Sequence, residues 1–318
     1  MLKDNIKDIT AAIKYITTEN KLEELRNLEK TSNIFTVCFI AYLWISIFFL
    51  WYLVAYKGLY FFPLAVIVVA IQQRTLRNIL HDASHNSLLR NPIINDLIAD
   101  FFAGYPLFEK TKYFRKSHLD HHRFLGIKEK DPDFVCINTL DPTNEKSSFS
   151  IYLKAIFMQR WLLSSNLGNL IIFTLKDYLE LILWWSCFTF FMLIFFTVNK
   201  FIIFLCIWFI AKISIYHCLK VFMEISDHAG LPINGIIMGT RNLPSKFSSY
   251  IFFPFGDNYH LTHHLFPKIQ TFKLKKMHNI LMHWDKYANA CSPNNYLSGH
   301  NSVIKNWLQF RTQSPKNN

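Results

Sequence analysis

The residues best suited to chemistry in this sequence are three short clusters of histidine. The chain contains 13 histidines, and eight of them lie in the segments HDASH, HLDHH and HLTHH. These eight are His81, His85, His118, His121, His122, His260, His263 and His264. Because residues three or four positions apart share one face of an α-helix, each cluster would point its imidazoles in one direction. Converging imidazoles are typical of a site for a transition metal, so we predict a metal centre.

The number of imidazoles indicates how many ions this centre holds. Eight ligands exceed what one ion can use when a coordination position is left open for a substrate or oxygen, so we predict two ions. Imidazole binds zinc, copper, iron and nickel, and ligand type alone therefore leaves the metal open. His228 is a ninth candidate ligand, and Glu224 lies four residues before it on the same predicted helical face. Glu224 could be a ligand or a partner of a ligand, and both interpretations stay open.

Carboxylates near the clusters are suited to orienting the imidazoles. A metal-bound imidazole usually donates its other ring N–H to a carboxylate or a carbonyl. Four aspartates lie close to candidate ligands in the sequence, namely Asp82, Asp120, Asp227 and Asp257. Asp131 and Asp133, in the segment DPDF (residues 131–134), would either orient the site or lie in a solvated turn. The histidines outside the clusters are predicted to be hydrogen-bonded core residues, namely His217, His278, His283 and His300.

The rest of the sequence must position these clusters, and much of it is strongly apolar. Apolar residue types make up 51% of the chain. Residues 33–56 contain no charged side chain, and as a helix they would be about 36 Å long, enough to cross a hydrocarbon core of about 30 Å. We predict four spanning helices in two hairpins, at about residues 33–56, 59–80, 179–198 and 201–222. Two further apolar segments, residues 93–108 and 161–175, are interrupted by polar residues and are predicted to lie in the membrane interface. The predicted fold class is an all-α integral membrane protein.

The six cysteines are scattered, without a CxxC pair. They are Cys38, Cys136, Cys187, Cys206, Cys218 and Cys291. We predict that they are small buried hydrophobic residues with no metal or disulfide role.

The positive charge of the chain, formally +12 at pH 7, indicates its orientation in the membrane. Each hairpin turn holds one lysine, Lys57 or Lys200, whereas residues 110–130 and the tail from Lys268 are strongly basic. Because basic loops stay on the cytoplasmic side, we predict both termini and all histidine clusters there. Topology and anionic lipid account for this charge, so binding to nucleic acid is not predicted. The predicted organisation is a cytoplasmic amphipathic head (1–31), a single membrane-embedded domain (32–279) and a cytoplasmic tail (280–318).

Three segments of the chain, HDASH, RKSHLDHHRFLGIKEKDPDF and GDNYHLTHHLFPKI, resemble the membrane fatty acid desaturase superfamily. That family has three histidine boxes, HxxxH, HxxHH and HxxHH, which hold a non-haem di-iron centre. The resemblance extends from about residue 33 to 279, with the apolar hairpins placed between the boxes as in the family. It implies four spanning helices, a cytoplasmic cap and nine iron ligands, which are the eight box histidines and His228. Some acyl-CoA desaturases have an asparagine where this chain has Glu224, which leaves the part of Glu224 in coordination open.

The resemblance also implies an activity, the introduction of a double bond into a lipid acyl chain with two iron ions and with O₂ as co-substrate. No catalytic residue separate from the metal ligands is predicted. No flavin, haem or iron–sulfur motif is visible, so electrons would come from an external donor such as a ferredoxin. The usually acidic surface of such a donor would meet the basic residues 110–130. Independently of the resemblance, removal of hydrogen from an unactivated C–H bond requires a redox-active metal, which favours iron over zinc.

Other functions are compatible with parts of the pattern. A hydroxylase or a carotenoid ketolase would use similar boxes on a similar topology. A membrane zinc hydrolase would need a carboxylate base beside its ligands, as in HExxH; Asp82 stands in that place, but eight histidines exceed the needs of one zinc ion. A metal transporter would place its histidines within the spanning helices instead of beyond their ends. Desaturation of an acyl chain is therefore the function that we predict.

Overall fold

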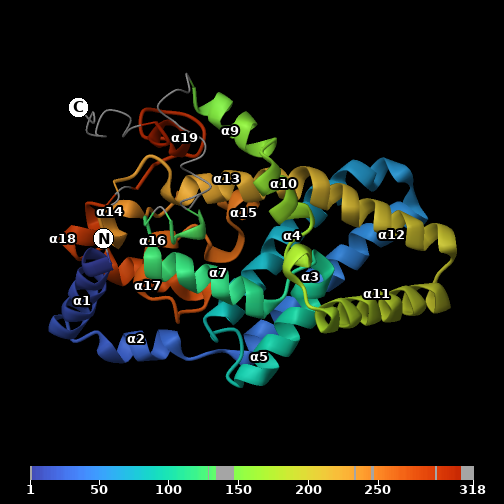
Figure 1. Cartoon of the computed structure of the whole chain (residues 1–318), viewed down its shortest axis with the longest axis horizontal. Helices are drawn as coiled ribbons and strands as arrows, with labels where there is room; N and C mark the ends of the chain where they lie inside the picture. The colour runs from blue at the N-terminus through green and yellow to red at the C-terminus, as the bar shows by residue number, and fades with distance from the viewer. Residues whose placement is uncertain are drawn as a thin grey trace. The chain divides into compact units, whose positions relative to one another are not determined.

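The structure is a computed structural model that describes residues 2–127, 129–133, 147–232, 234–244, 247–290 and 292–308. In these ranges the chain consists of helices joined by loops, without a β-strand (Figure 1). The predicted all-α fold class is therefore confirmed. The chain divides into two compact units. We call Ser32–Arg115 with Gln159–Lys220 the span unit, and Met1–Thr31, Lys116–Met158 and Val221–Asn318 the histidine unit.

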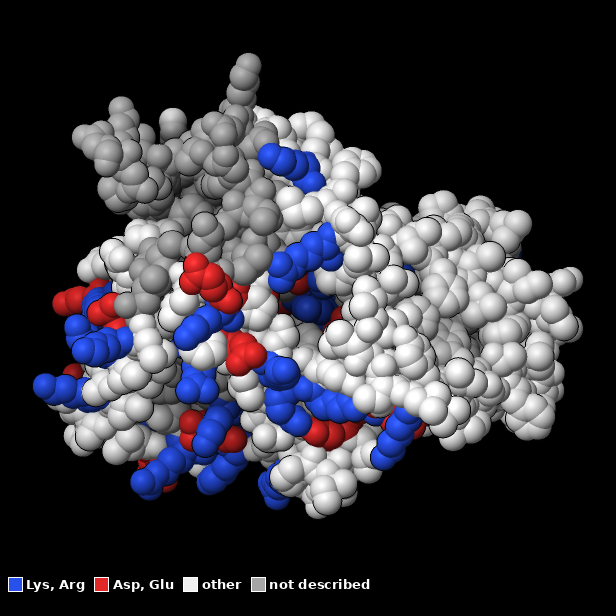
Figure 2. All heavy atoms as spheres, viewed as in Figure 1, with Lys and Arg blue, Asp and Glu red and all other residues white. Residues whose placement is uncertain are grey.

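Four helical segments are long and apolar enough to cross a membrane, as the sequence predicts. They are Asn33–Lys57, Leu59–Ser84, Leu175–Phe195 and Val198–His228. Their regular parts are α3 (Asn33–Tyr52), α4 (Phe62–Ser84), α11 (Leu175–Phe195), α12 (Val198–Ala211) and α13 (His217–His228), with π-helical turns at Leu53–Lys57 and Lys212–Tyr216 and a 3₁₀ turn at Leu59–Phe61. The surface over α11 and α12 in Figure 2 is almost free of charged side chains, which suits contact with lipid.

Three of these segments differ in extent from the prediction. The second continues past the predicted residue 80 to Ser84. The third begins at Leu175, because Thr174 and Asp177 form a reciprocal capping box in which each side chain accepts a hydrogen bond from the other residue's backbone N–H. The fourth continues past the predicted residue 222 to His228. The first residue after it with a left-handed backbone conformation is Gly230, where φ is 73°. The last turns of α13, with His228 and Glu224, belong to the histidine unit.

The core of the span unit lies where α3, α4 and α12 pack against one another. Leu43 and Trp208 are almost inaccessible there. The Nε1 of Trp51 donates a hydrogen bond to the carbonyl of Lys200 at 2.8 Å, and the Nε2 of Gln73 donates to the carbonyl of Trp208 at 2.8 Å. Such bonds satisfy polar groups that hydrocarbon could not satisfy.

Short helices occupy the two segments that were predicted to lie in the interface. They are α5 (Pro92–Ala99), a π-helical turn (Asp100–Gly104), α6 (Tyr105–Leu107), α10 (Gln159–Asn166) and a 3₁₀ turn (Leu170–Ile172). Neither segment is a candidate span, in agreement with the prediction. Their location in the interface stays a prediction. Asp96 binds the guanidinium of Arg115 at 2.5 Å and 2.7 Å, and Asp100 accepts hydrogen bonds from the backbone N–H and hydroxyl of Thr111 at 2.6 Å and 2.7 Å.

A cluster of charged side chains lies at the beginning of α11. Lys110 Nζ and Lys112 Nζ lie 2.9 Å and 2.8 Å from Asp177 Oδ1, and Lys110 also binds Glu180. The Lys176 ammonium is 3.9 Å from Glu180. We call these five residues the Asp177 cluster. Asp177 is fully buried and Lys110 nearly so, which means that their charges depend on one another.

The Asp177→Ala variant is expected to lower the free energy of unfolding by about 3 kcal/mol, because it leaves the buried Lys110 with one carboxylate fewer and removes the acceptor of the Thr174 backbone N–H in the capping box. The measurement is thermal unfolding of the purified full chain in detergent. Lys176→Ala is the matched control, since the Lys176 side chain is 84% exposed, and it should change stability by less than about 0.5 kcal/mol. Equal unfolding temperatures for the two variants would contradict the role given to Asp177.

The cysteines differ from the prediction in their burial. Cys38, Cys187 and Cys206 are exposed, and Cys218 is half-buried. These four are free thiols, as predicted, but they are not core residues. The physical reason is that all four lie on candidate spans, where the apolar surroundings of a side chain can be lipid instead of protein. Cys136 and Cys291 lie outside the described residues.

The histidine unit is built from shorter helices. They are α1 (Leu2–Thr18), α2 (Leu22–Glu29), α7 (Thr111–Phe124, from Lys116 onward), α9 (Ser148–Ile156), α14 (Ile236–Gly239), α15 (Ser249–Phe252), α16 (His260–Leu265), α17 (Leu274–Leu281), α18 (Asp285–Ala288) and α19 (Val303–Asn306), with 3₁₀ turns at Pro254–Gly256 and Thr271–Lys273. Residues of α1, α14, α16 and α17 share one apolar core. The N-terminal helix is therefore part of the structure that carries the third histidine cluster.

Asp8 fixes α1 against α14. Its carboxylate accepts a hydrogen bond from the backbone N–H of Ile237 at 3.0 Å and pairs with Lys286 Nζ at 2.7 Å. Gly235 precedes α14 with φ of 98°, and a Cβ there would lie 2.5 Å from Asp8 Oδ2. Glycine is thus required both by the backbone conformation and by the approach of the Asp8 carboxylate.

Candidate metal centre

The histidine clusters lie on helices, as their spacing predicts. The second cluster is on α7 and the third is on α16, while His228 is the last residue of α13. All of these residues belong to the histidine unit. In the span unit, His81 lies in the last turn of α4 and His85 directly follows that helix.

Four histidines of the histidine unit converge in one group. They are His121, His228, His260 and His264, each of which offers a ring nitrogen within 4.8 Å of the others. The Nε2 atoms of His121 and His264 are 3.2 Å apart, those of His264 and His260 are 3.1 Å apart, and those of His260 and His228 are 3.0 Å apart. His121 and His264 are buried, so the group lies inside the unit. We call it the four-histidine group.

Three more histidines of the same unit form a second group. The Nε2 of His122 is 3.1 Å from that of His118 and 2.9 Å from that of His263. The Nε2 atoms of His118 and His263 are 3.4 Å apart. We call this the three-histidine group.

The helices α7 and α16 each contribute histidines to both groups. Both carry the sequence HxxHH. In each helix the first and last histidines of the cluster, four residues apart, join the same group, whereas the middle one joins the other group. Residues four apart are separated by about 40° around a helix and residues three apart by about 60° in the opposite sense. One helix can therefore serve two adjacent groups.

The spacing of the Nε2 atoms fits metal ions. A neutral imidazole has a single N–H, so a ring that donates through Nδ1 has only a lone pair at Nε2. His121 and His228 both have an Nδ1 partner, as described below. Lone pairs that face one another at about 3 Å repel, and a cation between them removes the repulsion. Metal–nitrogen bonds of about 2.0–2.1 Å would separate neighbouring ligand nitrogens by roughly 3 Å. The donor set therefore fits a transition metal that prefers imidazole.

Asp131 orients His121. Its Oδ1 lies 2.8 Å from His121 Nδ1 and accepts a hydrogen bond from the backbone N–H of Asp133 at 3.0 Å, while its Oδ2 accepts one from Gly126 N–H at 2.8 Å. Both Asp131 and His121 are about 1% exposed. Asp131 therefore holds the imidazole with Nε2 toward the four-histidine group, whereas the sequence left open whether it belongs to a solvated turn. Phe134, the last residue of that segment, lies outside the described residues.

A backbone carbonyl orients His228. The Nδ1 of His228 lies 2.9 Å from the carbonyl oxygen of Gly239 at the end of α14, so Nδ1 carries the proton and Nε2 faces the group. A carboxyl oxygen of Asp227 is 3.9 Å from the Nε2 of His260. Glu224, which the sequence proposed as a ligand or partner, is not a member of the four-histidine group.

Burial and charge act in opposite directions on the pKa values in this site. Burial disfavours the imidazolium form of His121, but the carboxylates of Asp133 and Asp131 outweigh it and raise the pKa of His121 to about 9. Burial also opposes the ionised form of Asp131, yet the hydrogen bond from His121 lowers the pKa of that carboxyl. Burial, together with the imidazole of His122, lowers the pKa of His264 well below its usual value. A neutral His264 has the lone pair that metal ligation requires.

A buried polar network supports the middle of α16. The hydroxyl of Tyr287 lies 2.6 Å from Thr262 Oγ1, 2.7 Å from Asn242 Nδ2 and 2.8 Å from His278 Nδ1. Asn242 Oδ1 also accepts a hydrogen bond from the backbone N–H of Thr262 at 3.2 Å. Thr262 directly precedes His263, so the network fixes the helix that carries three of the ligands. No sequence pattern indicates this network, because Asn242, Thr262 and Tyr287 are 20 or more residues from one another along the chain.

The end of α4, with the first cluster, is held by Arg115 within the span unit. The guanidinium donates hydrogen bonds to the carbonyls of Ser84 at 3.0 Å and Ala83 at 2.8 Å, both in the last turn of the helix. The ring centroids of His81 and His85 are 5.5 Å apart. The approach of these two histidines to the other seven stays a prediction.

The histidines outside the clusters agree with the prediction only in part. The Nδ1 of His217 lies 2.8 Å from Ser165 Oγ, and His278 bonds to Tyr287, so these two are hydrogen-bonded as expected. His283 and His300 are exposed, and the prediction that they are core residues is wrong. Exposure is the ordinary position for an isolated polar side chain on a loop.

The basic residues 110–130 are less accessible than the sequence suggests. Lys110 is buried against Asp177 and Glu180, and Arg115 is paired with Asp96. The exposed cations of this segment are Lys112, Lys116, Arg123 and Lys130, and Lys128 lies outside the described residues. Internal carboxylates thus compensate part of the charge that was predicted to face an electron donor.

Comparison with known proteins found similarity over most of the chain. The model of the family described as fatty acid desaturase matches residues 57–293, a range that includes all three clusters and His228. Dihydrorhizobitoxine desaturase of Bradyrhizobium elkanii is 28% identical over 251 residues, which cover 73% of this chain and 70% of the relative. Both findings agree with the resemblance that the histidine segments carry.

Proposed function

Because the chain belongs to the fatty acid desaturase family, we propose that it is an oxygen-dependent oxidoreductase that introduces a double bond into a lipid acyl chain. The observation that carries this proposal is the convergence of seven imidazoles into two adjacent groups within one unit. Two groups of nitrogen ligands suit two iron ions. The four candidate spans support a substrate that is dissolved in the membrane.

The four-histidine group would hold one iron ion. We propose that the three-histidine group holds the second ion, and that His81 and His85 are iron ligands as well. When bound, the two ions would supply the activation of O₂ that removal of hydrogen from an unactivated C–H bond requires. No redox-inert ion could replace iron in that role, which is why we favour iron over zinc.

Hydrogen-bond partners around the two groups orient the histidine rings. Asp131 and the Gly239 carbonyl each accept from Nδ1, which directs Nε2 of His121 and His228 toward the four-histidine group. A metal ion bound there would displace the Nε2 proton that His121 carries in its absence. The buried positions of His121, His263 and His264 exclude bulk water from the ligands. Water exclusion protects reactive species from side reactions and strengthens electrostatic interactions in the site.

The proposed reaction needs electrons from outside the chain. One O₂, two protons and two electrons from a donor combine with the two hydrogens removed from the acyl chain, which gives two molecules of water and one new double bond. We propose a soluble donor such as a ferredoxin on the cytoplasmic side, where the termini and histidine clusters would lie. The exposed side chains of Lys116, Arg123 and Lys130 are suited to an acidic donor surface.

Lipid analysis of a host that expresses the full chain tests this function. We expect acyl chains with one additional double bond, and we expect their loss in the His263→Ala variant, which removes one ligand of the three-histidine group. A keto or hydroxyl product would replace the desaturase assignment by a ketolase or hydroxylase. Unchanged acyl chains and a product derived from a non-lipid compound would instead overturn the lipid substrate, a result worth testing because the relative is named for dihydrorhizobitoxine. Purified protein that holds two zinc ions and no iron, with both metals supplied, would overturn the oxygenase chemistry.

A further inference from the structure

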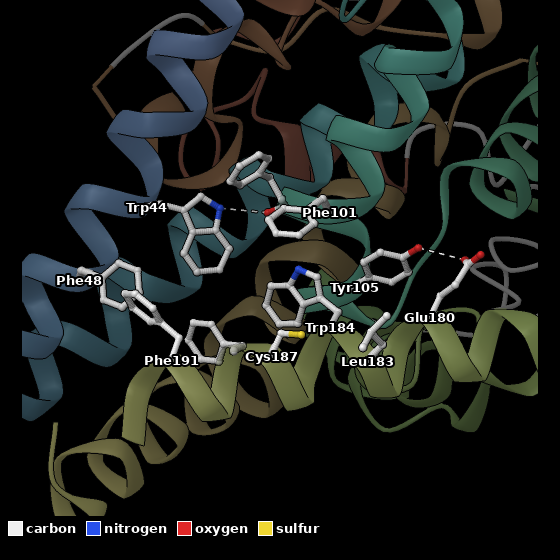
Figure 3. A pocket seen from close by; sticks show the side chains of 11 residues that line it. Trp44, Phe48, Phe101, Tyr105, Glu180, Leu183, Trp184, Cys187 and Phe191 are labelled. Carbon is white, nitrogen blue, oxygen red and sulfur yellow. Dashed lines mark hydrogen bonds between the residues drawn. The ribbon is translucent and has the colours of Figure 1, made fainter. Parts of the chain in front are cut away.

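The span unit contains an elongated apolar cavity of about 640 Å³ (Figure 3). This volume lies within the range of about 300–1,000 Å³ that is usual for sites of small molecules. Its walls come from α3, from the turn and helix that follow α5, and from α11. No lining residue is a histidine, so the cavity is distinct from the candidate metal centre.

One continuous stripe of α11 forms the longest wall. The lining residues of this helix are Glu180, Leu183, Trp184, Cys187, Phe188 and Phe191, whose spacing of three or four places them on one helical face. At a rise of about 1.5 Å per residue this stripe is roughly 16 Å long. The stripe therefore suits an elongated ligand.

Aromatic rings form most of the remaining wall. Trp44 and Phe48, four residues apart on α3, face the stripe together with Phe101 (Figure 3). Phe102 lines the cavity as well. The indole N–H of Trp44 is already used, because it donates to the carbonyl of Phe102 at 3.1 Å. The middle of the cavity thus consists of hydrocarbon and aromatic surface, where a water molecule would find few hydrogen-bond partners.

One end of the cavity is polar. Glu180 and Tyr105 line it there, and the Tyr105 hydroxyl donates to Glu180 at 3.1 Å (Figure 3). Glu180 belongs to the Asp177 cluster, which contains three lysines and two carboxylates, a net charge of +1. The Glu180 carboxylate itself lines the cavity, and the positive charges of the cluster that an anionic head group could meet are the exposed ammonium groups of Lys112 and Lys176, whose side chains are 49% and 84% exposed.

We propose that this cavity binds one acyl chain of an anionic phospholipid from the surrounding bilayer, with the head group at the Asp177 cluster. Two of its walls, α3 and α11, are candidate spans, and a bilayer around these spans would offer acyl chains as apolar ligands. Leu183 and Phe191 are 64% and 49% exposed, so the cavity is open along its side. A second acyl chain of the same lipid can remain in the bilayer. The site does not depend on the proposed metal chemistry.

Photo-crosslinking with a phosphatidylglycerol that carries a diazirine in one acyl chain tests the proposal in full-length protein reconstituted into bilayers. We expect crosslinks on the residues of α11 that line the cavity. Cys187→Trp fills the cavity and should reduce this labelling by about tenfold, since the indole takes the space of several methylene groups. Ile182→Trp is the matched control, because Ile182 is 59% exposed on the same helix and does not line the cavity, and labelling should stay within about twofold.

The head-group contribution has its own test. Lys176→Gln removes the excess positive charge and should lower labelling by the anionic probe more than labelling by a phosphatidylcholine probe with the same chain. Equal labelling of Cys187→Trp and Ile182→Trp, or crosslinks spread evenly around α11, would overturn the site. Equal labelling of the wild-type chain by the two lipids would overturn the anionic head group, and stronger labelling by a diazirine fatty acid would overturn the phospholipid. Because none of these readouts requires turnover, they can fail while the proposed function holds.

Discussion

The His264→Ala variant is expected to bind one metal ion fewer per chain than the wild-type protein and to lose at least about 100-fold in activity. The Nε2 of His264 lies 3.2 Å from that of His121 and 3.1 Å from that of His260, so its ring contacts two other members of the four-histidine group. Loss of residues that only orient a ligand costs about 10–100-fold in affinity or activity, and loss of the ligand itself should cost more. Elemental analysis of the purified protein measures the first effect and acyl-chain analysis the second.

A histidine from the same unit provides the control. His283 is exposed, so His283→Ala should retain both ions and full activity. Membrane insertion and the unfolding temperature of both variants, measured without added metal, separate loss of a ligand from loss of the fold. Retention of two ions by a folded His264→Ala protein would contradict the assignment of the four-histidine group.

The parts of the site that follow from local geometry could be predicted from the sequence. The i, i+3, i+4 spacing of HLDHH and HLTHH requires a helix if the imidazoles are to share a face, and both segments are helical. The four spans are similarly determined by the length of their apolar runs. In both cases the information lies within about 25 consecutive residues.

The division of ligands between two groups could not be predicted in this way. The sequence predicts that all histidines of one cluster point in one direction. In the structure, α7 and α16 each contribute two histidines to one group and one to the other. That division depends on how the two helices face each other, and they are separated by more than 100 residues of chain. The packing of segments that are distant in the sequence determines this division, and the periodicity of a short segment cannot predict such packing.

Hydrogen-bond partners that act through the backbone could not be predicted from the sequence either. The Gly239 carbonyl orients His228, and because every residue has a backbone carbonyl, the residue type at this position does not reveal the contact. Lys110 was predicted to be part of a basic surface, and it is buried. Its carboxylate partners Asp177 and Glu180 lie more than 60 residues away in the sequence, so the pairing could not be predicted. Without knowledge of such a partner, the sequence predicts that a lysine is exposed.

Asp131→Asn is expected to weaken metal binding by the four-histidine group by about 10–100-fold while the fold is retained. The two carboxylate oxygens of Asp131 face N–H groups on both sides, Oδ1 toward His121 Nδ1 and the Asp133 backbone, and Oδ2 toward the Gly126 backbone. An amide has one oxygen, so either His121 or Gly126 would face an NH₂ group that cannot accept its hydrogen bond. The negative charge that favours a donating Nδ1–H would also be lost.

Competition with a chelator at fixed pH measures this change, because it reports metal affinity without requiring turnover. Asp133→Asn is the matched control: the Asp133 carboxylate lies 3.6 Å from His121 Nδ1, beyond hydrogen-bond distance, and its side chain is 44% exposed. The Asp133 charge also raises the pKa of His121, but it makes no hydrogen bond to the ring and solvent partly screens it, so the control should change affinity less than about threefold. If the two variants lost metal equally, the general electrostatic effect of the carboxylates of Asp131 and Asp133 would explain the loss. A loss confined to Asp131→Asn would instead identify the hydrogen bond to His121 as the contact that holds this ligand in place.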